Sequence, residues 1–261
     1  MKQFLLKQIR RRSMQRFWES VGHISVLGRN HWSTHLRLSG ELTALELLSK
    51  TIKPGGILFD VGANSGEYSL EALRILEPMK IYAFEPSKTA YQVLCNTIMS
   101  AGLERIITPE QLALGEARGQ AILHSSGAGA TSASLLDLRT TFKSFSAEFD
   151  EPVIVTTLDE FCKEKGIKHI DLLKIDVEGL ELAVLRGATK MIDGLAIGAI
   201  QFEFGVGNIE SRTFFRDFFD LLAPQFNLFR VVSDGLWPVP RYHAELEQCA
   251  AINYMAVRKQ K

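Results

Sequence analysis

Short apolar runs alternate with amphipathic stretches along most of this 261-residue chain. Runs such as Ile57 to Val61 and Ile170 to Ile175 have the length of buried strands, and an apolar pattern of helical spacing follows each of them. This alternation predicts an α/β fold of the doubly wound type, in which a parallel sheet carries helices on both faces. The expected strands are Ile57 to Val61, Lys80 to Phe84, one within Glu104 to Ala113, Gln120 to His124, Ile170 to Ile175, Ala196 to Phe204, Phe226 to Val232 and Cys249 to Val257. The expected helices are Glu41 to Thr51, Glu67 to Leu76, Lys88 to Ser100, Leu158 to Lys165, Glu178 to Ile192 and Arg212 to Leu222.

Some segments depart from this alternation. Ser125 to Ser134 is rich in Gly, Ala and Ser, a composition typical of a mobile loop or a lid. No helical pattern separates the last two expected strands, so we expect them to pair antiparallel, with Leu236 to Glu247 as the loop between them. Thr157 and Glu160 have the spacing of a capping box at the start of a helix.

The N-terminal part has a pattern of its own. We expect residues 1–52 to form a helical extension and residues 53–261 to form the main domain. Two interpretations of the first, basic amphipathic helix stay open. It packs on the domain or on a second subunit of a homo-oligomer, or it docks on an anionic membrane surface. Its basic residues are Lys2, Lys7, Arg10, Arg11, Arg12 and Arg16, and its apolar ones are Phe4, Leu5, Ile9, Phe17 and Val21.

Composition narrows the compartment and the class of partner. Thirty Lys and Arg residues balance thirty Asp and Glu residues, which gives no general case for nucleic acid as a partner. Cys95, Cys162 and Cys249 have neither metal-ligand nor catalytic spacing, which favours free thiols in a reducing, cytoplasmic compartment. No apolar run reaches membrane-spanning length, and the basic N-terminus lacks the apolar core of a signal peptide.

The most informative stretch links the first expected strand to its helix. The strand region contains Asp60, and Gly62 and Gly66 enclose Asn64 in the loop that follows. Such a loop brings backbone N–H groups and a helix N-terminus close to a ligand, with no Cβ in the way at the glycines. After the next strand, Glu85 is placed where a ribose presents its hydroxyls. Together these features predict a nucleoside cofactor.

The glycine spacing of this loop and the charge of Asp60 indicate which nucleoside cofactor fits. A dinucleotide-binding loop has the spacing G-x-G-x-x-G, whereas Gly62 and Gly66 are four residues apart. A carboxylate at Asp60 repels a pyrophosphate but suits a ligand with an ammonium group. S-adenosylmethionine carries an amino acid end and a ribose and has no phosphate, so the residue types favour it over NAD.

A second group of charges lies at the end of the strand Ile170 to Ile175. Lys174 and Asp176 interrupt an apolar run near the carboxyl end, where open α/β sheets bind ligands, and period two places them on one face. Glu178 and Glu181 are expected in the first turn of the next helix. The alternative is that Lys174 and Asp176 only pair with each other while Glu178 caps the helix. We favour a functional role, because buried charges gather at functional sites.

The neighbouring strand repeats this arrangement. Gln201 and Glu203 share a face near its end, and Glu203 is expected one strand away from Asp176. If both acids converge, they can hold a hydroxyl substrate or a divalent ion, and the alternative is a surface carboxylate at a strand end. No His-rich or Cys-rich spacing accompanies them, so a dedicated metal site is not predicted.

Two of the six histidines are candidates for the site. His243, in the loop before the final strand, is the first candidate for a substrate contact or a proton acceptor. His124, which precedes the small-residue loop, is the second. The remaining histidines are expected to be structural or to face solvent, and they are His23, His31, His35 and His169.

Several of these motifs, in this order and spacing, resemble the FkbM-type methyltransferases. The most specific of them is the block Lys174-Ile175-Asp176-Val177-Glu178-Gly179. The resemblance covers roughly Pro54 to Gly205 and leaves both ends of the chain uncovered. The other matching stretches are Phe59 to Gly66, Phe84-Glu85-Pro86, Ala113-Leu114-Gly115, Thr157 to Phe161, Leu185 to Ala188 and Phe202-Glu203.

The resemblance implies a class I methyltransferase domain, a Rossmann-like sheet of about seven strands whose last strand is antiparallel. It implies S-adenosylmethionine as methyl donor, with Glu85 at the ribose and Asp176 and Glu178 facing the reaction centre. It also implies an acceptor hydroxyl on a sugar or another natural product, glycolipid-type acceptors included. The residues it places around the cofactor are Asp60, Gly62, Ala63, Asn64, Gly66, Glu85, Pro86, Leu112 and Ala113, the last two near the adenine.

These residues suggest a mechanism and leave two rivals. We expect in-line transfer of the sulfonium methyl to a hydroxyl oxygen in a pocket that excludes water. Asp176 is the first choice for the base that takes the proton, followed by Glu178 and His243, while Lys174 keeps Asp176 ionised. The rivals are an NAD-dependent dehydrogenase or epimerase, and a non-catalytic protein that binds the cofactor and serves as a scaffold.

Overall fold

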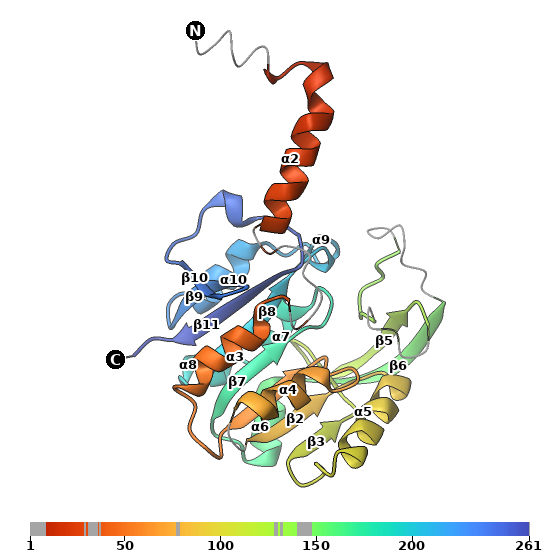
Figure 1. Ribbon diagram of the computed structural model, residues 1–261. Helices are drawn as coiled ribbons and strands as arrows, with labels where there is room; N and C mark the ends of the chain where they lie inside the picture. Colours follow the sequence, from red (N-terminus) through yellow and green to blue (C-terminus); the bar gives the residue numbers. More distant parts are fainter. Residues whose placement is uncertain are drawn as a thin grey trace.

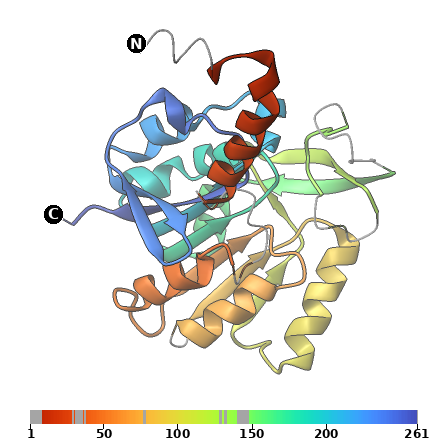
Figure 2. The same cartoon turned by 45° about the horizontal axis from the view of Figure 1, so that its top comes forward.

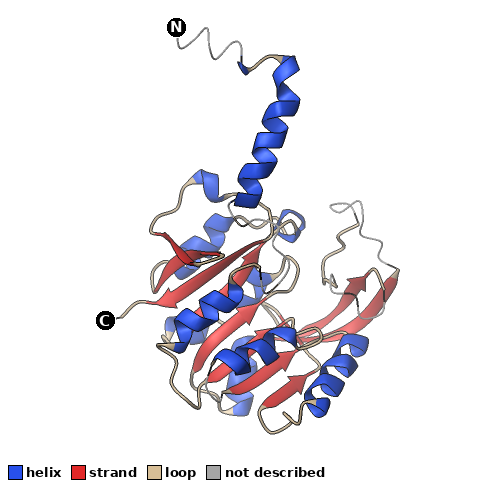
Figure 3. Cartoon of the chain, in the orientation of Figure 1, coloured by secondary structure: helices blue, strands red, loops and turns tan. Residues whose placement is uncertain are grey.

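The computed structural model describes residues 9–28, 30, 36, 38–76, 79–127, 130, 133–139 and 148–260 of the chain. The strands form an eight-stranded sheet in the order β10-β9-β11-β8-β7-β1-β2-β3 and a three-stranded sheet in the order β4-β6-β5 (Figures 1 and 3). The large sheet consists of β1 (Ile57–Val61), β2 (Lys80–Phe84), β3 (Ile107–Glu110), β7 (Ile170–Ile175), β8 (Ile197–Phe204), β9 (Phe226–Val232), β10 (Gly235–Val239) and β11 (Ile252–Arg258). The small sheet consists of β4 (Ala113–Leu114), β5 (Gly119–Ser125) and β6 (Phe149–Thr156).

Helices cover both faces of the large sheet, which confirms the predicted doubly wound α/β fold (Figure 2). One face is covered by α6 (Leu158–Lys165), α7 (Glu181–Arg186), α8 (Thr189–Asp193) and α10 (Phe215–Leu222). The other face is covered by α3 (Glu41–Ser49), α4 (Glu67–Ile75) and α5 (Lys88–Ser100). The remaining helices are η1 (Arg12–Met14), α2 (Gln15–Gly28), α9 (Gly207–Glu210) and η2 (Ala244–Leu246).

Successive side chains of the central strands point to opposite faces of the sheet, and this determines which of them approach the site. Phe59 and Val61 of β1 belong to the core beneath α6, whereas Leu58 belongs to the core beneath α4. Asp60 therefore points to the α4 side, and in the parallel pairing of β1 with β7 it lies opposite Lys174. The two charged side chains thus meet on one face of the sheet.

The far edge of the large sheet differs in part from the prediction. β11 lies between β8 and β9 and is antiparallel to both, so the expected antiparallel last strand is confirmed. The prediction that Leu236 to Glu247 is a loop is wrong for its first part. A two-residue turn follows β9, and Gly235 then begins β10, which pairs antiparallel with β9 from Gly235 to Val239. The main sheet has eight strands for this reason.

Two predicted helices begin later than expected. The helix expected from Glu178 starts at Glu181, because Glu178 and Gly179 have φ angles of 57° and 110°, outside the helical region. That helix is also divided into α7 and α8 around Gly187 and Ala188. The helix expected from Arg212 starts at Phe215, because Arg212 has a φ of 54°.

The small sheet extends from the large one beside the ends of β1 and β2 (Figure 1). Its hairpin of β5 and β6 pairs antiparallel from Gly119 to Ser125, and Ser134 forms a bridge with His124. Part of the predicted small-residue loop, at 128–129 and 131–132, lies outside the described residues, so its role as a lid stays a prediction. The predicted cap of α6 is confirmed, since the Thr157 hydroxyl accepts a hydrogen bond from the backbone N–H of Glu160.

The N-terminal extension has two different parts. α2 buries none of its residues, whereas α3 places Ala44, Leu45 and Leu48 in the core on one face of the sheet. The boundary at residue 52 stays a prediction, although α3 on its N-terminal side packs with the domain. No helix among the described residues is long and apolar enough to cross a membrane. The predictions made for Lys2, Phe4, Leu5, Lys7, His31 and His35 lie outside the described residues.

Candidate active site

Two adjoining pockets lie at the carboxyl ends of β1, β2 and β7, where the sequence predicted a ligand. The first encloses about 620 Å³, counting its open mouth, and has mainly aliphatic walls, so we call it the apolar pocket. The second encloses about 1210 Å³ on the same measure. It is lined by five carboxylic residues and one lysine, and we call it the acidic pocket. Four residues line both pockets, namely Gly62, Asn64, Asp176 and Glu178.

The glycine loop fits its place only without a side chain at Gly62. This residue has a φ of 79°, and a Cβ there would lie 1.8 Å from the backbone oxygen of Asp176. The loop after β1 can therefore press against the loop after β7, and the two walls of the site meet. Gly66, with a φ of 87°, immediately precedes α4 and lines neither pocket. Its position therefore supports a role in the turn of the loop more than the predicted contact with a ligand.

Glu85 is held rigidly in the apolar pocket. Its side chain is 6% exposed, and its two oxygens accept hydrogen bonds of 2.9 Å from the backbone N–H groups of Asn64 and Ser87. Burial raises the pKa of Glu85, while these two hydrogen bonds act in the opposite direction. Each oxygen keeps a further lone pair, so this carboxylate can still accept from two neighbouring hydroxyls.

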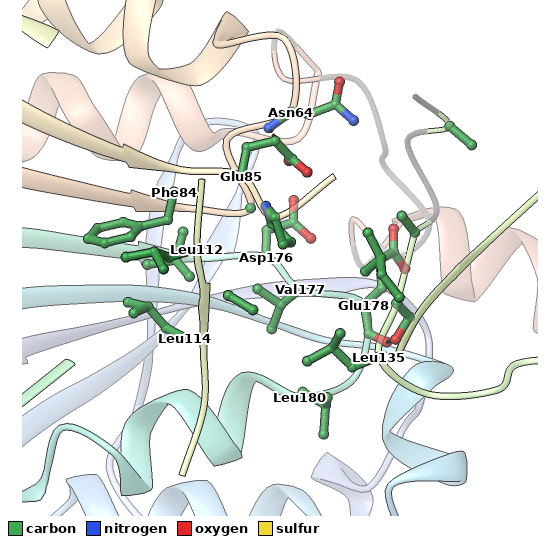
Figure 4. A pocket seen from close by; sticks show the side chains of 18 residues that line it. Asn64, Phe84, Glu85, Leu112, Leu114, Leu135, Asp176, Val177, Glu178 and Leu180 are labelled. Atoms are coloured by element: carbon green, nitrogen blue, oxygen red, sulfur yellow. Dashed lines mark hydrogen bonds between the residues drawn. The ribbon is translucent and has the colours of Figure 1, made fainter. Parts of the chain in front are cut away.

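The rest of the apolar pocket is suited to a flat apolar group. Figure 4 shows Phe84, Leu112 and Leu114 together on one side and Glu178 on the other, with Glu85 beside Asn64. The predicted cofactor residues Pro86, Leu112 and Ala113 all line this pocket. Leu123 of β5 and Leu135 extend the wall, and neither was among the residues predicted from the sequence.

Asp60 does not lie in a pocket wall. It is fully buried, and it lines neither pocket. Its Oδ2 accepts a 2.7 Å hydrogen bond from the Ser69 hydroxyl, and its Oδ1 lies 3.3 Å from the Lys174 ammonium. The expected direct contact with the amino group of a cofactor is therefore not what its position supports, because α4 and β7 already occupy its carboxylate. Asp60 therefore contributes to the site indirectly, by holding the Lys174 ammonium in place.

Lys174 connects this buried carboxylate with the acidic pocket. Its ammonium lies 3.6 Å from Oδ2 of Asp176 and donates to the backbone oxygen of Gly62 at 3.3 Å. Burial by itself would lower the pKa of Lys174, but the carboxylates of Asp60, Asp176 and Glu41 raise it above the ordinary value. Lys174 is thus a fixed positive charge, and its predicted pairing with Asp176 is confirmed.

The loop between β7 and α7 is organised by Glu181. Its Oε1 accepts hydrogen bonds from the backbone N–H groups of Val177 and Gly179, at 3.1 and 3.0 Å. This ties the loop down and leaves Asp176 and Glu178 facing the junction of the two pockets. Burial, followed by the charges of Asp176 and Glu181, raises the pKa of Glu178 to about 8.

The acidic pocket gathers residues from distant parts of the sequence. Glu203 lines it, as expected from its position on β8, one strand away from Asp176. Burial, followed by the charges of Asp176 and Glu178, raises the pKa of Glu203 well above its ordinary value. Sequence reasoning missed Glu41 and Asn253, which also line this pocket. Asn253 could have been predicted from the antiparallel pairing of β11 with β8, in which it lies opposite Glu203.

One wall of the acidic pocket is held by a chain of side-chain hydrogen bonds. The Tyr68 hydroxyl donates to Gln201 at 2.9 Å, and the Gln201 amide donates to Glu41 at 2.6 Å. Ser39 completes the chain by donating to the other oxygen of Glu41, also at 2.6 Å. Gln201 and Glu41 are buried, so this chain joins α3, α4 and β8 and fixes their spacing.

Two predicted candidates lie elsewhere. His243 lines a separate depression with Trp237, lies 3.9 Å from the exposed Glu245 and lines neither pocket, so its position does not support the expected substrate contact. The hairpin of β9 and β10 turns that loop away. His124 pairs with Asp150 at 2.7 Å across the β5–β6 hairpin and lines neither pocket. Among the described residues, no group of three His, Cys, Asp or Glu side chains is placed to hold a metal ion.

Comparison with known proteins identifies relatives of this chain. The family model of the methyltransferase FkbM domain matches residues 60–231. The 2-O-methyltransferase NoeI of Sinorhizobium fredii is 28% identical over 156 residues, which are 56% of this chain and 63% of NoeI. The hexuronic acid methyltransferase AglP of Haloferax volcanii is 25% identical over 169 residues, 65% of each chain. The 31-O-demethyl-FK506 methyltransferase FkbM of Streptomyces tacrolimicus is 29% identical over 158 residues, 52% of this chain and 60% of that one.

The chain therefore spans between 60% and 65% of the length of these relatives. Among solved structures, an O-methyltransferase from Bacillus cereus matches with a TM-score of 0.45 and 13% identity, over 96% of this chain and 93% of that one. The family match runs from Asp60 in β1 to the end of β9 and includes both loops that meet at the junction of the pockets. The chain belongs to the FkbM methyltransferase family.

Proposed function

We propose that this chain is an S-adenosylmethionine-dependent methyltransferase that acts on a hydroxyl group of a sugar or another natural product. The observation that carries this proposal is the junction of the two pockets. Asp176 and Glu178 line both of them, so a nucleoside in the apolar pocket and an acceptor in the acidic pocket meet at two carboxyl groups. Membership of the methyltransferase family supports the same activity.

The apolar pocket fits the proposed cofactor. Glu85 offers a fixed carboxylate for the two ribose hydroxyls, and Leu112 and Ala113 offer an apolar wall for the adenine. Towards the junction, the carboxyl group of Asp176 can accept hydrogen bonds from an ammonium group. S-adenosylmethionine, when bound, supplies an electrophilic methyl group on a positively charged sulfur. No phosphate group is needed for this fit, which distinguishes the proposed cofactor from NAD.

The two carboxyl groups at the junction suit different tasks. Asp176 faces the Lys174 ammonium, which pairs with its carboxylate form, so Asp176 can accept the proton of an acceptor hydroxyl. Glu178, with a pKa of about 8, keeps its proton near neutral pH and can donate a hydrogen bond to the acceptor. Lys174 positions Asp176 and does not itself face the apolar pocket.

The nature of the acceptor follows from the acidic pocket and from the relatives. Carboxyl and amide groups such as Glu203 and Asn253 line it, and such groups form hydrogen bonds with several hydroxyls at once. The relatives include a 2-O-methyltransferase, a hexuronic acid methyltransferase and a 31-O-demethyl-FK506 methyltransferase, which supports sugars or other natural products as the acceptor class. The proposed acceptor is therefore a small molecule or a glycan. We also propose a cytoplasmic location, because free cysteines such as the three in this chain are typical of reducing compartments.

The experiment that tests the proposed function is methyl transfer from labelled S-adenosylmethionine. The full chain is incubated with the labelled donor and a panel of neutral, amino and acidic sugars and polyketide alcohols, and products are identified by mass spectrometry. The proposal expects a product that carries one methyl group on oxygen. Transfer to nitrogen or carbon, or turnover of NAD with none of S-adenosylmethionine, would contradict it.

A further inference from the structure

The α2 helix presents a free apolar surface. None of its residues is buried, and the helix projects away from both sheets (Figure 1). Its large apolar side chains are instead open to solvent, with Phe17 exposed by 52%, Val21 by 38% and Ile24 by 69%. Since contiguous apolar surface is rarely left open on a monomer, this helix points to an interaction.

Three of the exposed apolar side chains of α2 lie on one side of the helix. Phe17, Val21 and Ile24 follow the spacing i, i+4 and i+7, which places them in one stripe. The Trp18 ring packs against Phe17 in an edge-on contact at 4.9 Å and widens the stripe. Glu19 lies on the opposite side, so α2 is amphipathic.

Positive charge is concentrated at the free end of the same helix. Arg10, Arg11 and Arg12 precede α2 and Arg16 lies in its first turn, and only Glu19 opposes them between residues 9 and 28. No ion pair joins these four arginines to another described residue. The whole chain has a formal net charge of zero, so this end is a local positive region.

We propose that α2 and the arginines before it dock on a bilayer surface that carries anionic lipids. Aromatic and aliphatic residues on one face with arginines beside them are the features of a helix that lies in the membrane interface. The charge favours this occupant over a second copy of the chain, because a second copy of residues 9–28 brings four more arginines and one glutamate, whereas anionic lipids neutralise the positive region. The helix has 14 residues, and it lies on the membrane without crossing it.

The connection that follows α2 contacts the domain beside the acidic pocket. Asn30, two residues after α2, donates hydrogen bonds to Ser39 and to Val231 at the end of β9. Leu36, in the same connection, lines the acidic pocket. The docked helix therefore joins the domain beside the pocket that we assign to the acceptor. Docking itself does not rest on the proposed function, and it can be tested without methyl transfer.

The test is co-sedimentation of the full chain with lipid vesicles. One set contains phosphatidylcholine alone, and the other contains about one quarter phosphatidylglycerol, since anionic lipids attract basic residues near the membrane surface. We expect binding to the anionic vesicles that weakens with added salt. The double variant Phe17→Ser/Ile24→Ser and the double variant Arg11→Glu/Arg12→Glu should each weaken this binding about tenfold or more.

Two matched controls separate docking from general loss of hydrophobicity or charge. Ile122→Ser/Ile154→Ser removes two exposed isoleucines from the small sheet, and Lys50→Glu/Lys53→Glu reverses two exposed lysines near the end of α3. Both should bind vesicles as the wild type does. Absence of binding by the wild type, or equal binding by the α2 variants, would overturn the proposal. A wild-type dimer that Phe17→Ser/Ile24→Ser converts to a monomer would also overturn it and assign the face to a second copy.

Discussion

The Lys174 ammonium lies 3.3 Å from Oδ1 of Asp60 on the buried side of the junction between β1 and β7. Asp60 is fully buried and Lys174 is 6% exposed, so each needs the other's charge. Lys174→Met leaves Asp60 as an uncompensated buried charge, and we expect the free energy of unfolding to fall by about 3–5 kcal/mol. Urea denaturation followed by circular dichroism measures this loss.

A surface ion pair provides the control for that prediction. Lys165 lies 2.8 Å from Glu110 and is 43% exposed, so Lys165→Met should cost less than about 1 kcal/mol. Similar losses in the free energy of unfolding for Lys165→Met and Lys174→Met would contradict a larger contribution from the buried pair.

Gly62→Ala should disrupt the fold around the site. The added Cβ would lie 1.8 Å from the backbone oxygen of Asp176, and the φ of 79° is strained for alanine. We expect a loss of stability of several kcal/mol, on the order of 3 or more. In the control Gly119→Ala the added Cβ meets nothing within 4 Å. Thermal melting compares the two, and equal melting temperatures would contradict the close approach of the loops.

Stability should fall with rising pH because of Glu178. Its pKa is raised to about 8 from the ordinary 4.5, so the folded chain holds a proton that the unfolded chain has lost between these values. The free energy of unfolding therefore falls as pH rises from about 4.5 to about 8. Glu181, with a pKa of about 7, contributes in the same direction.

Glu178→Gln should make that decline shallower, because glutamine does not titrate. Urea denaturation at about pH 5 and about pH 8 gives the difference for each protein. The exposed Glu104→Gln is the matched control and should keep the wild-type difference. An unchanged decline in Glu178→Gln would show that this carboxyl group is not buried as described.

The two carboxyl groups at the junction should respond differently to their amides. Asp176→Asn removes the proposed proton acceptor, so we expect turnover to fall by about 10²–10⁴. Glu178→Gln keeps a hydrogen-bond donor in place of a protonated acid and should lose much less. Initial rates with the acceptor found by mass spectrometry give kcat, and calorimetry with S-adenosylhomocysteine checks that the cofactor site is intact. The reverse order of losses would exchange the two roles.

Local sequence patterns predicted the parts of the molecule that depend on neighbours in sequence. Strand ends and glycine spacing brought Glu85 and Asp176 to the same edge, because the carboxyl ends of parallel strands share that edge. Period two along β7 and β8 correctly placed Glu203 near Asp176. These predictions need no knowledge of how the chain packs over long distances.

Long-range packing accounts for what the sequence did not reveal. Asp60 was expected to face a ligand, but Ser69 and Lys174, from other elements, cover it. Glu41 reaches the acidic pocket because Gln201, 160 residues later, binds its carboxylate. The position of His243 depends on β10, a strand that was not predicted, because β10 directs the following loop to another surface.

The most direct test of the proposed site is calorimetric titration with S-adenosylhomocysteine. We expect the wild type to bind it, and we expect Glu85→Gln to bind it about ten- to a hundredfold more weakly, because a charged hydrogen-bond acceptor for the ribose hydroxyls is lost. The control Glu104→Gln should bind as the wild type does. Wild-type affinity in Glu85→Gln, or binding of NAD without any binding of S-adenosylhomocysteine, would contradict the assignment of the apolar pocket.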